Sequence, residues 1–174
     1  MTGKILTILI VLTALIGGAA MYYLQVYAFY SDVTPTPGQD VMLTPVDGGT
    51  PIPIAYSQFK AIDADSSPIR YRACFETDLS IEMARAKYTE LSDQAPRTAP
   101  GWFDCFDAEA LGAELNAGTA TAFLSQKNIE YGVDRIVVLT NDGRGYAWHD
   151  LNNCGEKAYD GTVVGEECPP LPQR

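Results

Sequence analysis

The sequence has little positive charge and almost no histidine. Its 174 residues include 12 lysines and arginines against 22 aspartates and glutamates, and His149 is the only histidine. Nucleic-acid binding needs clustered positive charge, so we expect no nucleic-acid partner. Anionic lipid headgroups should likewise repel the acidic part of the chain, which leaves membrane attachment to an apolar segment.

Charge is absent altogether from residues 5–30, where only Gln25 and two threonines interrupt an apolar and aromatic run. A bilayer is crossed by about 20 apolar residues, so we expect residues 5–30 to contact the lipid bilayer as a transmembrane helix. Lys4 precedes this segment and Asp32 follows it. The positive-inside tendency therefore places residues 1–4 in the cytoplasm and exports the remainder.

A cleaved signal peptide is the alternative interpretation of this segment. Gly18 and Ala20 are small residues at the spacing that signal peptidase prefers. Cleavage after Ala20 would leave an exposed apolar start at residues 21–30, which a soluble protein would have to bury. An uncleaved signal anchor explains residues 21–30 better.

No C-x-x-C motif and no pair of histidines accompanies the four cysteines, so we expect no zinc site, no other metal and no cofactor. An even number of exported cysteines predicts two disulfides, for which three connectivities are possible. Pairing of sequence neighbours is favoured, which joins Cys74 to Cys105 and Cys154 to Cys168.

Proline and glycine are concentrated in residues 31–53, which predicts an extended stalk before a domain at residues 54–174. Helices are expected at 80–91, with Ser80 as N-cap, and from Asp107 to about residue 115, with Gly118 as the C-terminal stop. Strands are expected at residues 59–63, 68–75, 119–124, 135–140 and 146–151. The residues 141–145 predict a hairpin turn between the last two strands. This order predicts an α+β fold with a mostly antiparallel sheet and about two helices.

The strand at residues 68–75 alternates in character. We expect one face, with Ile69, Tyr71, Ala73 and Phe75, to lie on the core. The other face carries Arg70, Arg72 and Cys74.

Four stretches together resemble a known family: LTALIGGAAMYYLQVYAFY, AIDADSSPIRYRACF, APGWFDCFDAEALGAEL and NIEYGVDRIVVLTNDGRGYAWHDLNNCGEKAYDG. The resemblance is to uncharacterised small single-pass membrane proteins of Rhodobacter-like alphaproteobacteria. It covers most of the chain and implies an inner-membrane protein with a periplasmic domain. It implies no activity.

Candidate interaction residues stand out in two places. Trp102, Phe103 and Phe106 surround a cysteine and are either core over a disulfide or an exposed contact surface. Arg70 and Arg72 form a basic pair in an acidic domain and either join neighbouring acids or bind a carboxylate or phosphate. In the apolar segment, small residues at four-residue spacing allow close helix contact. They are Thr13, Ala14, Gly17 and Gly18.

Few residues are candidates for catalysis or metal binding. His149 is the one potential general base, yet Trp148 and Asp150 should point to the opposite face of its strand, which favours a structural histidine. No G-x-S-x-G motif is present. Asp63 and Asp65 have the spacing that opens a calcium loop, but Pro68 replaces the required glycine, which favours a turn.

These observations favour a non-catalytic interaction or assembly protein of the cell envelope, whose partner is another envelope protein. The alternative is a ligand-binding or sensory module in which Arg70, Arg72 and the Trp102 region line a pocket. An enzyme is the least favoured class, because no catalytic constellation is recognisable.

Overall fold

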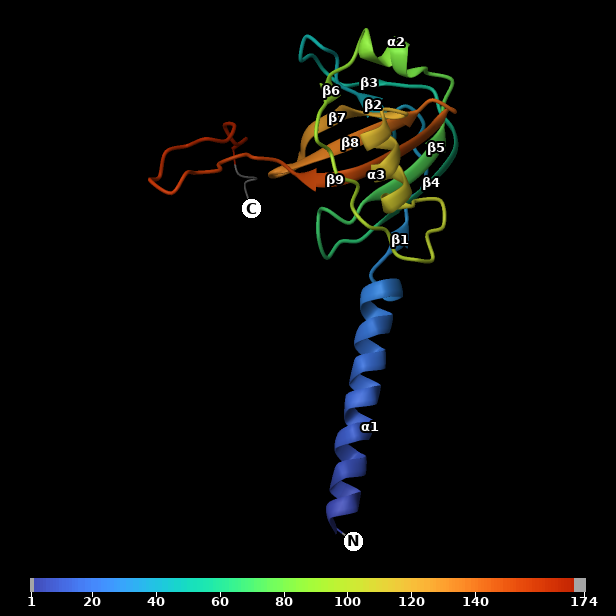
Figure 1. The fold of residues 1–174 in the computed structure, drawn as a ribbon, viewed down its shortest axis with the longest axis vertical. Helices are drawn as coiled ribbons and strands as arrows, with labels where there is room; N and C mark the ends of the chain where they lie inside the picture. The colour runs from blue at the N-terminus through green and yellow to red at the C-terminus, as the bar shows by residue number, and fades with distance from the viewer. Residues whose placement is uncertain (1, 171–174) are drawn as a thin grey trace.

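The computed structural model describes residues 2–170 as an apolar helix that projects from one end of a folded domain (Figure 1). The helix consists of α1, Thr2–Tyr23, and a wider π-helical continuation, Leu24–Ala28. Residues 3–28 are long and apolar enough to cross a bilayer, and they are not buried in the domain. Met1 and residues 171–174, which belong to the expected terminal segments, lie outside the described residues.

A seven-stranded antiparallel sheet, in the order β1-β4-β5-β9-β8-β7-β6, forms the centre of the domain. Its strands are β1 (Ser31–Asp32), β4 (Ser57–Asp63), β5 (Arg72–Glu76), β6 (Glu90–Leu91), β7 (Ala120–Glu130), β8 (Val133–Thr140) and β9 (Arg144–Leu151). A separate pair joins β2, Met42–Leu43, to β3, Ile52–Pro53. The predicted α+β class with a mostly antiparallel sheet is confirmed.

Both faces of the sheet are buried, so the domain has two hydrophobic cores. Successive residues of β8 alternate between them: Val137 and Leu139 enter the first core, whereas Ile136 and Val138 enter the second. The first core includes Val41 and residues of helix α2, and helix α3 covers the second. The expectation of a single core face on the strand at residues 68–75 is therefore wrong.

The two helices of the domain are α2, Ile81–Arg85, and α3, Ala108–Ala117. Asp107 caps α3 by accepting bonds from the first backbone N–H groups, and Gly118 ends it with a φ of +74°, as expected. Ser80 caps α2 as predicted, but α2 is shorter than the expected helix at 80–91. Residues 90–91 pair with β7 instead, because the sheet ladder overrides the helical pattern.

Residues 31–53 differ from the expected stalk because they are part of the domain. Val41 and Leu43 have no exposed surface and lie in the first core. The backbone N–H of Val33 donates to Ala61 O at 2.9 Å, which ties the segment to β4. The prolines and glycines in this segment separate the short strands β1, β2 and β3.

Gly145 of β9 lies opposite Phe75 of β5, and the structure leaves no room for a larger side chain at this position. A Cβ built on Gly145 would lie 2.1 Å from the Phe75 ring, which is itself buried. We expect Gly145→Ala to lower the free energy of unfolding by about 1–3 kcal/mol through overpacking. Urea unfolding of the full-length protein in detergent, followed by near-ultraviolet circular dichroism, measures this loss.

Gly101→Ala is the matched control, since nothing lies within 4 Å of its added Cβ. Its free energy of unfolding should stay within about 0.5 kcal/mol of the wild-type value. Equal stability of the two variants would contradict the close packing at Gly145.

Candidate functional site

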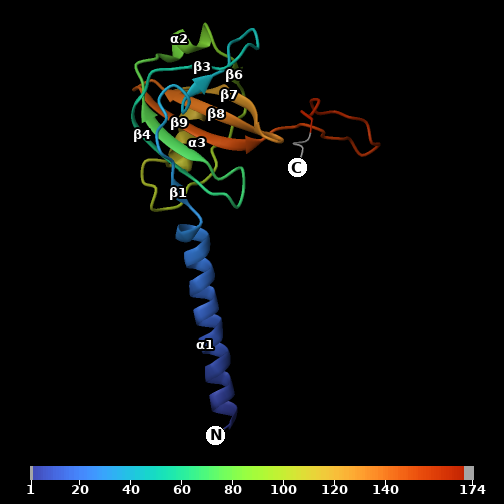
Figure 2. The same ribbon diagram turned by 180° about the vertical axis from the view of Figure 1, so that it is seen from behind.

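Residues 152–170 form an arm that leaves the sheet after β9 and extends sideways, across the direction of α1 (Figures 1 and 2). Most residues of the arm are exposed, and none enters either core. An extension of this length without a core of its own is uncommon in a small domain unless it serves binding. The arm is therefore the first candidate for an interaction site.

The root of the arm is fixed by Asn152. Its backbone N–H donates to Gly132 O at 3.0 Å, and its side-chain amide donates to Asp134 Oδ1 at 2.7 Å and to Asn128 Oδ1 at 2.9 Å. Its amide oxygen accepts a bond from the backbone N–H of Cys154 at 3.0 Å. One side chain thus ties the start of the arm to the β7–β8 hairpin.

Beyond this root, the disulfide between Cys154 and Cys168 joins the two ends of the arm. The N–H of Val164 donates to Glu156 O at 3.0 Å, so the two sides pair like a small hairpin. An ion pair between Lys127 and Glu166 adds a contact with β7. A covalently closed loop is partly ordered before binding, which lowers the entropy cost of an interaction.

The tip of the arm is a tight turn. The N–H of Ala158 donates to Thr162 O at 2.8 Å, and Gly161 has a φ of +87° that favours glycine. Asp160 Oδ1 accepts from the N–H of Thr162 at 3.0 Å, and hydrogen bonds from Thr162 lower the pKa of Asp160. The turn is therefore held by hydrogen bonds between its own residues.

Apolar side chains are exposed on this arm. Tyr159 is fully exposed, and Val163 and Val164 each keep more than half of their surface in water. Four carboxylates accompany them, from Glu156, Asp160, Glu166 and Glu167, against the single basic residue Lys157. Apolar surface rimmed by charge is typical of a protein contact.

Trp102 lies at the other candidate surface, where the domain meets the helix. Its indole Nε1 donates to Val26 O at 2.7 Å, and its ring stacks on Tyr27 with centroids 6.3 Å apart. Tyr30 packs edge-on against the same ring at 6.0 Å. The indole thus satisfies one of the carbonyls that a helix leaves open at its C-terminal end.

Arg70 joins the same junction from the loop between β4 and β5. Its guanidinium donates to Gln25 O at 3.4 Å and lies 5.4 Å from the centre of the Tyr30 ring. A cation is favourable at a helix C-terminus, where the helix dipole is negative. Trp102 and Arg70 therefore come together, as contacts of the helix end.

Arg72 does not join them. It is buried, and its guanidinium donates to four backbone oxygens, those of Ile69, Tyr71, Arg97 and Thr98. Burial lowers the pKa of Arg72 to about 10, so the side chain stays charged at neutral pH. Arg72 links two loops, and its donors are used on backbone oxygens, so it is not placed beside Arg70 and Trp102 to bind a ligand.

Phe103 and Phe106 are buried in the second core, beside the disulfide between Cys74 and Cys105. Phe106 packs edge-on against Trp148 at 6.3 Å. These two rings are core residues, in agreement with the first interpretation of their motif. Both disulfides follow the favoured pairing.

The small residues of the apolar segment lie on the exposed helix. A Cβ on Gly17 or Gly18 would meet nothing within 4 Å, and Ala14 is exposed. Thr13 Oγ1 donates to Leu9 O at 3.0 Å. Helix association through this face stays a prediction.

His149 is held within the fold by both ring nitrogens. Nε2 lies 3.0 Å from Arg135 Nε, and Nδ1 lies 2.7 Å from Pro68 O. Because a carbonyl can only accept, Nδ1 carries the proton and Nε2 accepts from Arg135. Burial, together with the charge of Arg135, lowers the pKa of His149 to about 4. The imidazole is therefore neutral, and neither nitrogen is free to act as a base.

Asp63, from the possible calcium loop, bonds its own turn. Its Oδ1 accepts from the N–H of Ala64 at 2.8 Å, and the N–H of Ser67 donates to Ala64 O at 3.2 Å. Burial raises the pKa of the Asp63 carboxyl. The arrangement is that of a side-chain-capped turn.

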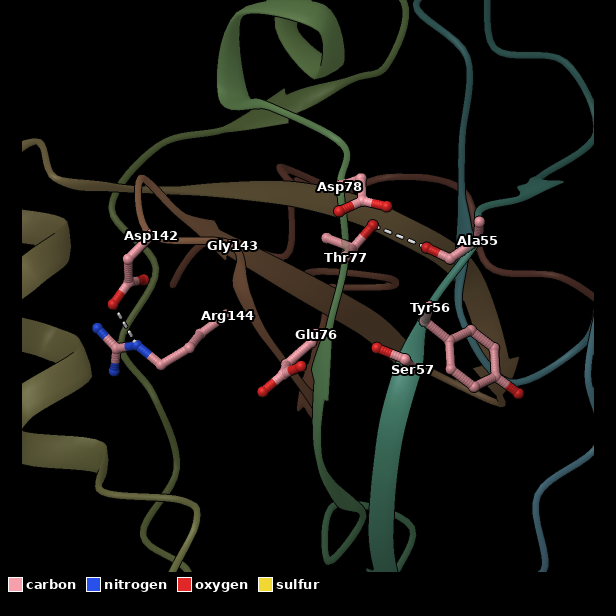
Figure 3. Close-up of a pocket in the computed structure, with 9 residues that line it drawn as sticks. All are labelled: Ala55, Tyr56, Ser57, Glu76, Thr77, Asp78, Asp142, Gly143 and Arg144. Atoms are coloured by element: carbon pink, nitrogen blue, oxygen red, sulfur yellow. Dashed lines mark hydrogen bonds and ion pairs between the residues drawn. The ribbon is translucent and has the colours of Figure 1, made fainter.

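A cleft of about 320 Å³ opens between residues 55–57, 76–78 and 142–144 (Figure 3). Arg144 is the basic residue of its lining, and its guanidinium turns toward Asp142, with Nε 2.7 Å from Asp142 Oδ2. Glu114 Oε1 lies 2.9 Å from Nη2 of the same arginine. Because its cation is already paired with carboxylates, the cleft offers little to an anionic ligand.

A family model described as a family of unknown function, DUF6446, matches residues 41–169. The match includes both disulfides and the arm as far as residue 169. The chain belongs to this family. No curated protein and no solved structure matches the chain. The expectation of an uncharacterised family is confirmed.

In this DUF6446 protein the arm is the feature that sequence reasoning missed. A hint was present, because Tyr159, Val163 and Val164 lie between two cysteines that were expected to pair. The local sequence does not distinguish a buried from an exposed apolar residue, and only the fold places these three in solvent.

The burial of His149 predicts how the stability of this DUF6446 protein depends on pH. An unfolded histidine has a pKa of about 6.5. The folded pKa is about 4, so the unfolded state binds more protons between these values. We expect the histidine contribution to stability to be complete above pH of about 6.5 and to fall as the pH drops toward 4. The single His149 ring signal, followed by NMR, should not titrate between about pH 5.5 and 8.

His149→Gln is the control for this titration, because it removes the ionisable ring. Its stability should fall less steeply than that of the wild type as the pH drops from about 6.5 to 4. An imidazole midpoint near 6.5 in the folded protein would contradict the buried, neutral assignment.

Proposed function

We propose that this DUF6446 protein is a membrane-anchored, non-catalytic interaction module of the bacterial envelope, and that its arm docks on another envelope protein. In this proposal α1 crosses the inner membrane of an alphaproteobacterium. The N-terminus is cytoplasmic and the domain is periplasmic. The single observation that carries the proposal is the closed, projecting arm with Tyr159, Val163 and Val164 in solvent.

The compartment is supported by the cysteines. All four are joined in the disulfides Cys74–Cys105 and Cys154–Cys168. Disulfides persist in oxidising compartments and are rare in the cytosol. Lys4 before the apolar helix and Asp32 after it favour the same orientation.

The charge and the exposed apolar residues of the arm indicate which kind of partner surface would fit it. The arm carries four acids against one base, and the whole chain has a net charge of −10. Two arms in contact would bring their acids together at short range and repel each other. An apolar groove with a basic rim would instead complement Tyr159, Val163 and Val164. We therefore propose a different envelope protein with a groove of that kind.

A non-catalytic role is supported by the state of the reactive side chains. Both nitrogens of His149 are hydrogen-bonded within the fold, and the four cysteines are oxidised. The chain has no other histidine. The histidine, the residue that most often supplies a general base, and the thiols are thus occupied.

The proposed orientation is tested with reporter fusions. Alkaline phosphatase fused after the C-terminus should be active in cells, because it folds only in an oxidising compartment, and green fluorescent protein fused there should be dark. The same reporters at the N-terminus should give the reverse pattern. Fluorescent C-terminal fusions would show the domain to be cytoplasmic and would sink the proposed orientation.

The docking role of the arm is tested by photo-crosslinking in living cells. A photoreactive benzoylphenylalanine replaces Tyr159 or Val163, and adducts are separated by mass and identified by mass spectrometry. We expect one protein to be crosslinked from both positions. A reciprocal crosslink from its proposed groove should return this chain.

Val46 is the matched control position, because it is as exposed as Val163 but lies in the loop between β2 and β3. It should give no adduct of that mass. The double variant Cys154→Ser and Cys168→Ser should lower the yield at Tyr159 at least several-fold, since the open arm is less ordered. Equal adducts from Val46 and the arm would refute docking through the arm.

A further inference from the structure

With the charged Lys4 placed at the cytoplasmic edge of the hydrocarbon core, the length of the helix gives the depth of its last residues in a bilayer. At 1.5 Å per residue, the 20 residues from Ile5 to Leu24 cover the roughly 30 Å of a hydrocarbon core. Each headgroup layer adds about 5–7 Å, which corresponds to roughly the next three to five residues. The carbonyls of Gln25 and Val26 therefore lie in the headgroup layer.

Two side chains of the domain are bonded to these carbonyls. Trp102 Nε1 donates to Val26 O at 2.7 Å, and Arg70 donates to Gln25 O at 3.4 Å. A side chain that bonds a carbonyl in the headgroup layer lies in that layer itself. Their loops, residues 64–71 and 92–107, flank the helix end in both views of the domain (Figures 1 and 2).

Arg70 has donors left for a ligand at this depth. A guanidinium carries five N–H groups, of which one is used on Gln25 O. Within residues 2–170 no carboxylate pairs with Arg70, whereas Arg85, Arg97 and Arg144 each form an ion pair. The side chain is only half-buried. Its planar fork matches the oxygens of a phosphate.

We propose that the helix-proximal end of the domain is itself a bilayer contact, in which Arg70 binds the phosphate of a phospholipid and Trp102 lies beside it at the interface. Tryptophan is enriched at this level of membrane proteins. The net negative charge of the chain does not oppose the contact strongly, because repulsion between exposed charges is screened beyond about 8 Å at physiological salt. The guanidinium–phosphate bond acts at hydrogen-bond distance. The inference rests on α1 spanning the membrane and is independent of the arm.

The contact is tested on the full-length protein in bilayers of phosphatidylethanolamine and phosphatidylglycerol, in phosphate-free buffer. With ¹³C at the arginine Cζ, rotational-echo NMR detects any guanidinium carbon that lies close to a lipid ³¹P. We expect an arginine signal that is dephased by phosphorus in the wild type. In Arg70→Lys this dephased arginine signal should be lost.

Arg85→Lys is the matched control, since Arg85 is an exposed arginine of α2 at the end of the domain opposite α1 (Figure 1). It should keep the dephased signal. Flotation of the vesicles with bound protein in alkaline carbonate establishes that α1 is inserted. In inserted wild-type protein, the absence of dephasing would overturn the proposal, as would dephasing that persists in Arg70→Lys. Either result leaves the crosslinking test of the arm unaffected.

Discussion

Burial of strands β8 and β9 on both faces is the constraint on which the rest of the fold depends. Trp148 and Val138 enter the second core, while Leu139 and Ala147 enter the first. A large apolar side chain contributes roughly 1.5–3 kcal/mol when it is fully buried, so both faces need a cover. The segment before β4 covers one face, and the loop after β6 together with α3 covers the other. The proline-rich segment at residues 31–53 is therefore part of the domain, although a free stalk was expected there.

A series of contacts connects the sheet to the apolar helix. Cys74 on β5 is bonded to Cys105, in the loop that also carries Trp102, and the indole of Trp102 bonds the helix end at Val26. The direction of the helix is thereby coupled to the direction of the sheet. The arm leaves the sheet across the helix axis (Figure 2). If α1 spans a bilayer along its normal, as we propose, the arm extends parallel to the membrane surface.

Polar residues that resemble a reactive site are used here to hold the fold. Arg72 donates hydrogen bonds to four backbone carbonyl groups of two loops. His149 accepts a bond from Arg135 and donates one to Pro68 O. Buried polar groups need such partners, because a missing hydrogen bond costs about 1–3 kcal/mol. In contrast, Arg70 at the helix end has no carboxylate partner among residues 2–170, and the apolar side chains of the arm are exposed.

The sequence alone determined the features that depend on near neighbours. The apolar helix follows from a charge-free run, the caps of α3 from Asp107 and Gly118, and the β8–β9 hairpin from the turn at residues 141–143. The favoured disulfide pairing rested on the same closeness in sequence. The tertiary structure alone decided the short α2, the burial of Arg72, the meeting of Trp102 with Val26 and the exposure of Tyr159. Each of these depends on which surfaces meet across long sequence separations, and a local pattern carries no information about the partner on the opposite face.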